Sequence, residues 1–146
     1  MSDWHTLGHW TDRGPDACGV ILSDTLGRIA LQLRDDFEGV KGPGHWGFFG
    51  GEREGGETPE DAAIREMEEE TTLRFTSVDL IPFARTQSGL GTRIWMFATR
   101  RRFTPADITV REGAGFGFLT AAQIARGPTL ESSALIAAHY LSHHGN

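Results

Sequence analysis

Three glutamates on one face of a predicted helix are the residues of this sequence best suited to chemistry. Glu66, Glu69 and Glu70 are spaced i, i+3 and i+4, which brings their carboxylates to the same side of the helix. Carboxylates at this spacing repel one another and make the helix less stable. A hard divalent cation offsets the repulsion, because such ions prefer oxygen ligands. The spacing therefore favours a Mg²⁺ or Mn²⁺ site on this helix.

The residues around the glutamates complete the pattern of a metal site. Gly50 and Gly51 allow the backbone to fold closely over the start of the helix and to direct carbonyl oxygens inward. Arg65 lies one turn before Glu69 and can hold carboxylates through charge-assisted hydrogen bonds. Sites of this kind combine a few carboxylates with phosphate oxygens of a substrate. A solvated acidic face, the common role of a Glu-rich helix, stays open as the alternative.

Local signals place the ends of the helix that carries the glutamates. Thr58 is suited to the N-cap, Pro59 to the first helical position, and the following two acidic residues to the positive end of the helix dipole. The helix is expected to end near Thr71 and Thr72. Its inward face is expected to consist of Ala63, Ile64, Met67 and Thr71.

The rest of the chain predicts strands and two further helices. Strands are expected at 17–23, 28–34, 46–49, 75–86, 92–103, 108–111 and 115–119, and helices at 120–126 and 131–142. The first two strands are expected to pair as a hairpin around 24–27. Pro82 indicates an edge or a bulge, and the last helix offers Leu135, Ile136, Ala138 and Tyr140 for packing. This order predicts an α+β fold in which a mixed sheet lies between helices.

The composition describes an ordinary globular domain. A length of 146 residues suits a single domain spanning 1–146, and no apolar run approaches the roughly 20 residues of a membrane span. We expect no secretion signal at the N-terminus and a buried, unpaired Cys18, which together predict a cytoplasmic location. The net charge of −6 argues against a stable nucleic-acid complex.

Between Gly51 and Leu73 the sequence resembles the signature of the Nudix hydrolases. The matching positions are Gly51, Glu57, Arg65, Glu66, Met67, Glu69, Glu70 and Leu73. Thr72 stands where the family usually has glycine, and Phe49 replaces the proline often found before the glycine pair. The glycine shapes the helix exit and carries no chemistry, so we expect a local adjustment there. The wider resemblance extends over 15–142.

The resemblance implies an α/β/α sandwich with a mixed β-sheet and a divalent-metal-dependent hydrolase that cleaves a pyrophosphate bond. The substrate would be a nucleoside diphosphate linked to another moiety: a nucleoside triphosphate, a nucleotide sugar or ADP-ribose. By match to the signature, Glu66, Glu69 and Glu70 would bind Mg²⁺ or Mn²⁺, with a carbonyl of Gly50 or Gly51 completing the shell. Arg65 and Glu57 would orient the glutamates. One of the three glutamates would activate water, with Glu112 in a later loop as a candidate base or extra ligand and an exposed loop acid as its alternative.

Residues outside the signature are weaker candidates for the substrate site. Arg34 could meet a phosphate or sugar, or only solubilise the surface, and Trp46 and Phe48 could stack on a base or belong to the core. His139, His143 and His144 are too unlike a ligand set to predict a zinc site. A non-catalytic nucleotide-binding module stays open, although none of the glutamates is lost, and so does a homodimer.

Overall fold

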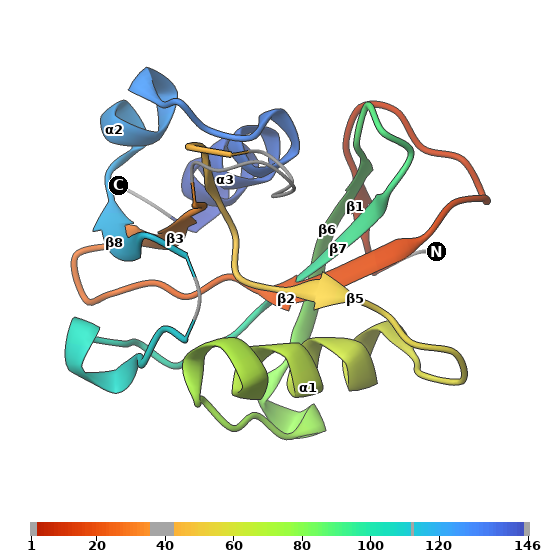
Figure 1. The fold of residues 1–146 in the computed structure, drawn as a ribbon, viewed down its shortest axis with the longest axis horizontal. Helices are drawn as coiled ribbons and strands as arrows, with labels where there is room; N and C mark the ends of the chain where they lie inside the picture. Colours follow the sequence, from red (N-terminus) through yellow and green to blue (C-terminus); the bar gives the residue numbers. More distant parts are fainter. Residues whose placement is uncertain (1–2, 36–42, 112, 145–146) are drawn as a thin grey trace.

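Two β-sheets and three α-helices form the architecture in the computed structural model, which describes residues 3–35, 43–111 and 113–144 (Figure 1). The helices are α1 (Pro59–Thr71), α2 (Ala121–Arg126) and α3 (Glu131–His144), and two 3₁₀ turns are η1 (Ser77–Asp79) and η2 (Pro105–Asp107). The strands are β1 (His5–Thr6), β2 (Asp16–Val20), β3 (Ile29–Leu33), β4 (Trp46–Gly47), β5 (Gly51–Glu52), β6 (Ile81–Gln87), β7 (Arg93–Ala98) and β8 (Gly115–Leu119).

The larger sheet is mixed, as the sequence predicts. Its strand order is β1-β6-β7-β2-β5, with parallel pairing of β1 to β6 and of β2 to β7, and antiparallel pairing at the other two contacts. The smaller sheet is antiparallel, in the order β4-β3-β8. The parallel register sets Asp16 beside Arg93 and Cys18 beside Trp95, while the antiparallel register sets Cys18 beside Gly51. These pairings bring the start of β2 to the glycines that precede α1.

The two faces of the larger sheet contribute to two separate hydrophobic cores. Val20 and Leu22 pack in a cluster with Met67 of α1, whereas the intervening Ile21 packs with Ile136 of α3. Successive side chains of a strand point to opposite faces. Helices α1 and α3 therefore cover opposite faces of the sheet, and Figure 1 shows them below and above it. The predicted α+β sandwich is confirmed.

Helix α1 forms where its local signals place it. Thr58 is the N-cap, its hydroxyl accepts from the backbone N–H of Asp61 at 3.1 Å, and the Asp61 carboxylate accepts from the N–H of Thr58 at 3.1 Å. This reciprocal capping box satisfies N–H groups that have no partner within the helix. At the other end Thr72 adopts a left-handed conformation, with φ of 66°.

Several predicted strands are wrong in extent. The expected hairpin closes with the bridge between Ser23 and Ile29, but β2 and β3 then separate into different sheets. Strand β6 begins only at Ile81, after η1, and its register shifts between Pro82 and Ala84, which confirms the expected bulge. Residues 108–111 form no strand, and the backbone N–H of Thr109 donates to the carbonyl of Thr71 at the end of α1.

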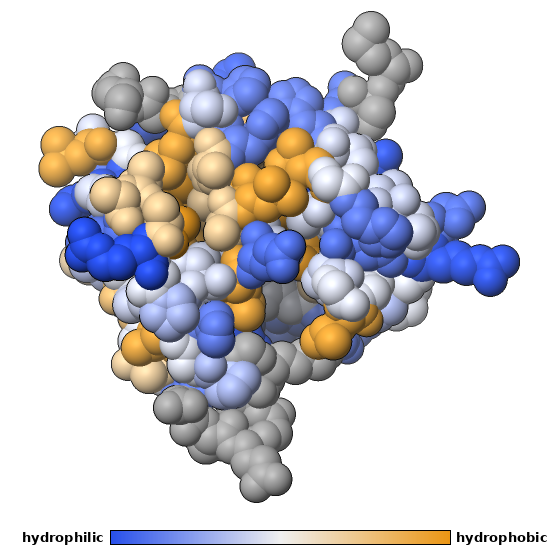
Figure 2. Space-filling view, turned by 90° about the horizontal axis from the view of Figure 1, so that it is seen from above, coloured by the Kyte–Doolittle hydropathy of each residue, from blue (hydrophilic) through white to orange (hydrophobic). Residues whose placement is uncertain are grey.

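The outer surface of α3 is more exposed than the sequence predicts. Ile136 and Tyr140 are buried, whereas Leu135 is 42% exposed and Ala138 is also exposed. Figure 2 looks at the molecule from the side of α2 and α3 and shows apolar side chains gathered beside hydrophilic ones on this face. Among the described residues, no helix has both the length and the apolar character needed to cross a bilayer.

Candidate metal and active site

Arg65 contacts several of the carboxylates of the predicted site. Its guanidinium binds the Glu57 carboxylate through two bonds, from Nε to Oε2 at 2.7 Å and from Nη2 to Oε1 at 2.9 Å. Nη1 donates to Glu66 Oε1 at 2.9 Å and contacts both oxygens of Glu69 at 3.3 and 3.4 Å. Nη2 also donates to the carbonyl of Glu52 at 2.9 Å. One side chain thus ties α1 to β5 and to the loop between them.

The contact between Arg65 and Glu57 keeps both residues charged. Hydrogen bonds from Arg65, and then one from the backbone N–H of Glu54 at 2.8 Å, lower the pKa of Glu57 to about 2. The bonds with Glu57 in turn raise the pKa of Arg65 further above its ordinary range. Charge-assisted, bidentate pairs of this kind fix orientation as well as adding energy. Glu57 therefore acts on the other carboxylates through Arg65.

The side chain of Glu66 is less exposed than those of Arg65, Glu57 and Glu69. Its side chain is 13% exposed, and burial raises the pKa of its carboxyl, against the lowering effect of Arg65. The carboxylate rests on the Cα side of Gly51, where a Cβ would overlap it. A side chain at position 51 would therefore displace Glu66, which explains why glycine is needed there.

Gly50 allows the same segment to lie flat on β2. Its φ is 149°, and a Cβ at this position would meet the carbonyl oxygen of Cys18 at 2.5 Å. A residue with a side chain would be both strained and obstructed there. The backbone between Phe49 and Gly51 can therefore reach the start of α1 only because two glycines occupy it.

The other two glutamates differ in exposure. The side chain of Glu69 is 58% exposed, whereas Oε2 of Glu70 is buried. The ligand atoms of Glu66, Glu69 and Glu70 do not all lie within 4.8 Å of one another. The donor set still fits a hard divalent cation, because it consists of carboxylate oxygens and includes one partly buried carboxylate beside a glycine cradle. The exposed Glu69 can rotate toward such an ion without disturbing the core.

An organising residue that the sequence did not reveal is Asp16. Its buried carboxylate accepts from Trp95 Nε1 at 2.9 Å, from Arg93 Nε at 2.8 Å and from Arg53 Nε at 3.0 Å. Burial alone would raise the pKa of Asp16, but these hydrogen bonds lower it below the usual range. Arg53 also donates to the carbonyl of Glu57 at 2.8 Å. Asp16 therefore anchors the loop that carries Glu57, and its one local signal is an acid at the start of an apolar strand.

An open groove runs beside the carboxylate cluster. Its volume is about 490 Å³. Since Arg65 and Glu69 line it, the groove is continuous with the cluster, and Arg111 adds a positive charge to its wall. A second hollow, of about 290 Å³ beside η1, shares no residue with the cluster. The residues that line the first groove are Asp61, Ile64, Arg65, Glu68, Glu69 and Arg111.

The predicted substrate residues lie apart from this groove. Trp46 and Phe48 are partly buried and pack against the core that α3 covers, which is the face of the sheet opposite α1. The backbone N–H of Arg34 donates to the carbonyl of His45 at 3.0 Å. None of the three lines the groove beside Arg65. Glu112 lies outside the described residues, so its role stays a prediction.

Known structures share this fold. MutT, in work on Aliivibrio salmonicida and Vibrio cholerae, is similar with a TM-score of 0.69 and 22% identity, covering 88% of this chain and 98% of the other. A MutT/Nudix family protein from Listeria innocua has a TM-score of 0.69 and 21% identity, covering 88% and 92% of the two chains. A MutT Nudix hydrolase from Burkholderia pseudomallei has a TM-score of 0.69 and 18% identity, covering 87% and 98%.

Two sequence comparisons gave different outcomes. No curated protein matches the sequence. Residues 13–127 match the NUDIX domain. The matched region covers most of the chain and contains strands β2 to β8, the glycine pair and helix α1. The chain therefore belongs to the Nudix domain family.

Proposed function

We propose that the protein is a divalent-metal-dependent hydrolase that cleaves a pyrophosphate bond in a nucleoside diphosphate linked to another moiety. Glu66, Glu69 and Glu70 hold Mg²⁺ or Mn²⁺, with a backbone carbonyl of Gly50 or Gly51 as a further ligand. Arg65 and Glu57 position these carboxylates. Residues 1–146 act as one Nudix domain, on a small nucleotide-type substrate.

The observation that carries the proposal is the set of contacts made by Arg65. Its guanidinium holds Glu57, Glu66 and Glu69 within 3.4 Å and Glu66 rests on Gly51. A helix that only needed a solvated acidic face would require neither the buried glutamate nor the glycine beneath it. Carboxylates held in a fixed arrangement at the edge of a core are what a divalent cation requires.

A bound divalent cation would neutralise negative charge on the phosphates and lower the pKa of a bound water molecule. This chemistry also explains how a chain with a net charge of −6 can bind a polyanion. Glu57 is a poor proton acceptor because its pKa is about 2, so it positions Arg65 instead of acting as a base. The general base is therefore one of Glu66, Glu69, Glu70 or the predicted Glu112.

The groove beside α1 is the proposed place for the substrate. Arg65 and Glu69 line its wall, and Arg111 stands there as a cation able to contact a phosphate. The volume of about 490 Å³ is in the range of sites for small ligands. The substrate stays open among a nucleoside triphosphate, a nucleotide sugar and ADP-ribose. Arg34, Trp46 and Phe48 stay predicted contacts for its base or sugar, which would have to extend beyond this groove because none of the three lines it.

Hydrolysis of a panel of these three substrate classes in millimolar Mg²⁺ tests the proposal. We expect release of phosphate or a nucleoside monophosphate from one class, with kcat reduced about 100-fold or more in Glu69→Gln and Glu70→Gln. Glu60→Gln is the matched control, because Glu60 lies in the first turn of the same helix and outside both the cluster and the groove. Tight binding of a nucleotide without turnover would instead favour the non-catalytic module. Activity that survives both substitutions would refute the assignment.

A further inference from the structure

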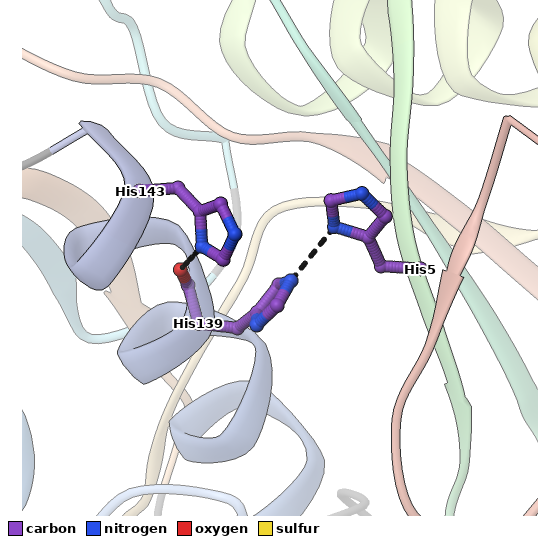
Figure 3. A group of neighbouring side chains, drawn as sticks. All are labelled: His5, His139 and His143. Carbon is purple, nitrogen blue, oxygen red and sulfur yellow. Dashed lines mark hydrogen bonds between the residues drawn. The ribbon is translucent and has the colours of Figure 1, made fainter.

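Three histidines from opposite ends of the chain meet on the face of the sheet that α3 covers. His5 lies on β1, and His139 and His143 lie one turn apart on α3. Figure 3 shows the three rings converging on a common space. One nitrogen from each ring lies within 4.8 Å of the others, and in the described part of the chain no other group of three His, Cys, Asp or Glu residues meets this criterion.

Hydrogen bonds leave a lone pair of His143 available to a ligand. His143 Nδ1 lies 2.9 Å from the carbonyl oxygen of His139. A carbonyl can only accept, so Nδ1 carries the hydrogen and Nε2 of the neutral ring keeps its lone pair. Metal-binding histidines commonly donate their second ring N–H to a backbone carbonyl in this way, which fixes both the tautomer and the ring orientation.

The other two rings already share a proton at bonding distance. His5 Nδ1 and His139 Nε2 are 2.7 Å apart, so one of them donates to the other. In a tetrahedral site with bonds of 2.0–2.1 Å, two ligand nitrogens are roughly 3.3 Å apart. A small opening of this contact, with the shared proton moved to the other nitrogen of its own ring, would give both rings a lone pair for an ion.

The surrounding structure holds the three rings in place. Phe83 of β6 packs with ring centroids 5.5 Å from His5 and 5.4 Å from His139. The parallel pairing of β1 with β6 sets His5 beside Ala84. His139 and His143, at i and i+4, have ring centroids 4.3 Å apart. The rings therefore need little ordering before they bind, which lowers the entropic cost of binding.

We propose that His5, His139 and His143 bind a borderline divalent transition-metal ion such as Zn²⁺, with an open position for water. Imidazole nitrogen suits Zn²⁺, Ni²⁺ and Cu²⁺ and does not suit Mg²⁺, which prefers oxygen. This site is separate from the glutamate cluster, because α1 and α3 lie on opposite faces of the larger sheet. An ion bound here connects strand β1 to helix α3.

Calorimetric titration of the untagged full chain with Zn²⁺, in millimolar Mg²⁺ that saturates oxygen sites, tests this proposal. We expect one Zn²⁺ per chain, with affinity reduced at least about tenfold in His5→Ala and in His143→Ala. Both side chains are exposed, so neither substitution opens the core. His9→Ala is the matched control, because His9 is exposed on the same N-terminal segment and lies outside the cluster.

Two further measurements test whether Zn²⁺ binds at the three histidines. Zn²⁺ should raise the unfolding temperature of the wild type and of His9→Ala, but not of the two site variants, because only ligand binding to the folded state stabilises it. Co²⁺ in place of Zn²⁺ should give the visible absorption of a tetrahedral nitrogen site. Absence of stoichiometric Zn²⁺ binding, or equal affinity in His5→Ala and the wild type, would overturn the proposal.

Discussion

The guanidinium of Arg65 holds the carboxylate of Glu57 through two hydrogen bonds of 2.7 and 2.9 Å, eight residues apart in the sequence. The same guanidinium reaches Glu66 at 2.9 Å, so a fixed pair that joins α1 to the loop before it sets the position of a carboxylate on α1. The arrangement resembles the outer shell of a metal site, in which partners of the ligands control their orientation. Because this pair is geometrically specific, small changes in it have measurable consequences.

Substitution of Arg65 by lysine keeps the charge and removes the planar fork. Lysine cannot hold Glu57 with two parallel bonds and reach Glu66 at the same time. We expect kcat/KM on the best substrate of the panel to fall by about 10- to 100-fold. Arg74→Lys is the control, since the Arg74 side chain is 84% exposed and pairs with Glu68, outside the cluster. Equal activity of Arg65→Lys and the wild type would mean that the fork has no positioning role.

Glu57 makes the stability of the protein depend on pH in acid. Its pKa is lowered from 4.5 to about 2 on folding, chiefly by Arg65, so the charged form stabilises the folded state above pH 4.5. That contribution is lost as the pH falls from 4.5 toward 2. Glu57→Gln never has it, so urea unfolding should show the wild type more stable than the variant at pH 6, with the difference shrinking near pH 2–3. A difference independent of pH would contradict the ionic role of Glu57.

Mg²⁺ should stabilise the folded protein through Glu66. The pKa of this carboxyl is raised by burial, so its charge is unfavourable in the metal-free protein and is offset when a cation binds. We expect millimolar Mg²⁺ or Mn²⁺ to raise the unfolding temperature of the wild type and of Glu60→Gln. In Glu66→Gln the rise should be largely lost, while the metal-free variant is at least as stable as the wild type at neutral pH. A full Mg²⁺-dependent rise in Glu66→Gln would exclude Glu66 as a ligand.

A methyl group at position 51 should displace the Glu66 carboxylate. A Cβ at this position overlaps the Glu66 carboxylate, so Gly51→Ala forces that side chain away from Arg65. We expect kcat to fall about tenfold or more and the Mg²⁺ concentration needed for activity to rise. Gly55→Ala is the matched control, because a Cβ at Gly55 meets nothing within 4 Å. If both variants lose activity equally, the effect arises from loop stiffness and not from Glu66.

The parts of the structure that the sequence predicts well are those fixed by neighbouring residues. The N-cap at Thr58, Pro59 at the first helical position and the cap of α2 at Thr120 all depend on contacts within a few residues. The contact of Arg65 with Glu57 likewise involves only a short loop and one helix. The roles predicted for both residues at the metal site stay predictions.

Features that depend on distant residues were not predicted. Strand β2 leaves its expected partner β3 because it pairs with β7, and the pairing sets Asp16 beside Arg93. The contact between His5 and His139 spans 134 positions in sequence. Such pairs have no local signal, since only the assembled sheet brings them together.

Thr72, the one departure from the signature at the helix exit, should limit stability and not activity. Its φ of 66° is costly for a β-branched residue, and glycine adopts this conformation without steric penalty. We expect Thr72→Gly to raise the free energy of unfolding by about 1 kcal/mol, measured by urea denaturation. Thr109→Gly is the control: Thr109 has no positive φ, so glycine there only adds entropy to the unfolded chain and should destabilise. Thr72 follows the last glutamate of the cluster by two positions, and it donates its backbone N–H to the carbonyl of Glu68 and its hydroxyl to the carbonyl of Thr71. Neither bond reaches a carboxylate of the cluster, so kcat should stay at the wild-type value. A stability gain accompanied by lost activity would show that the strained exit helps to place Glu70.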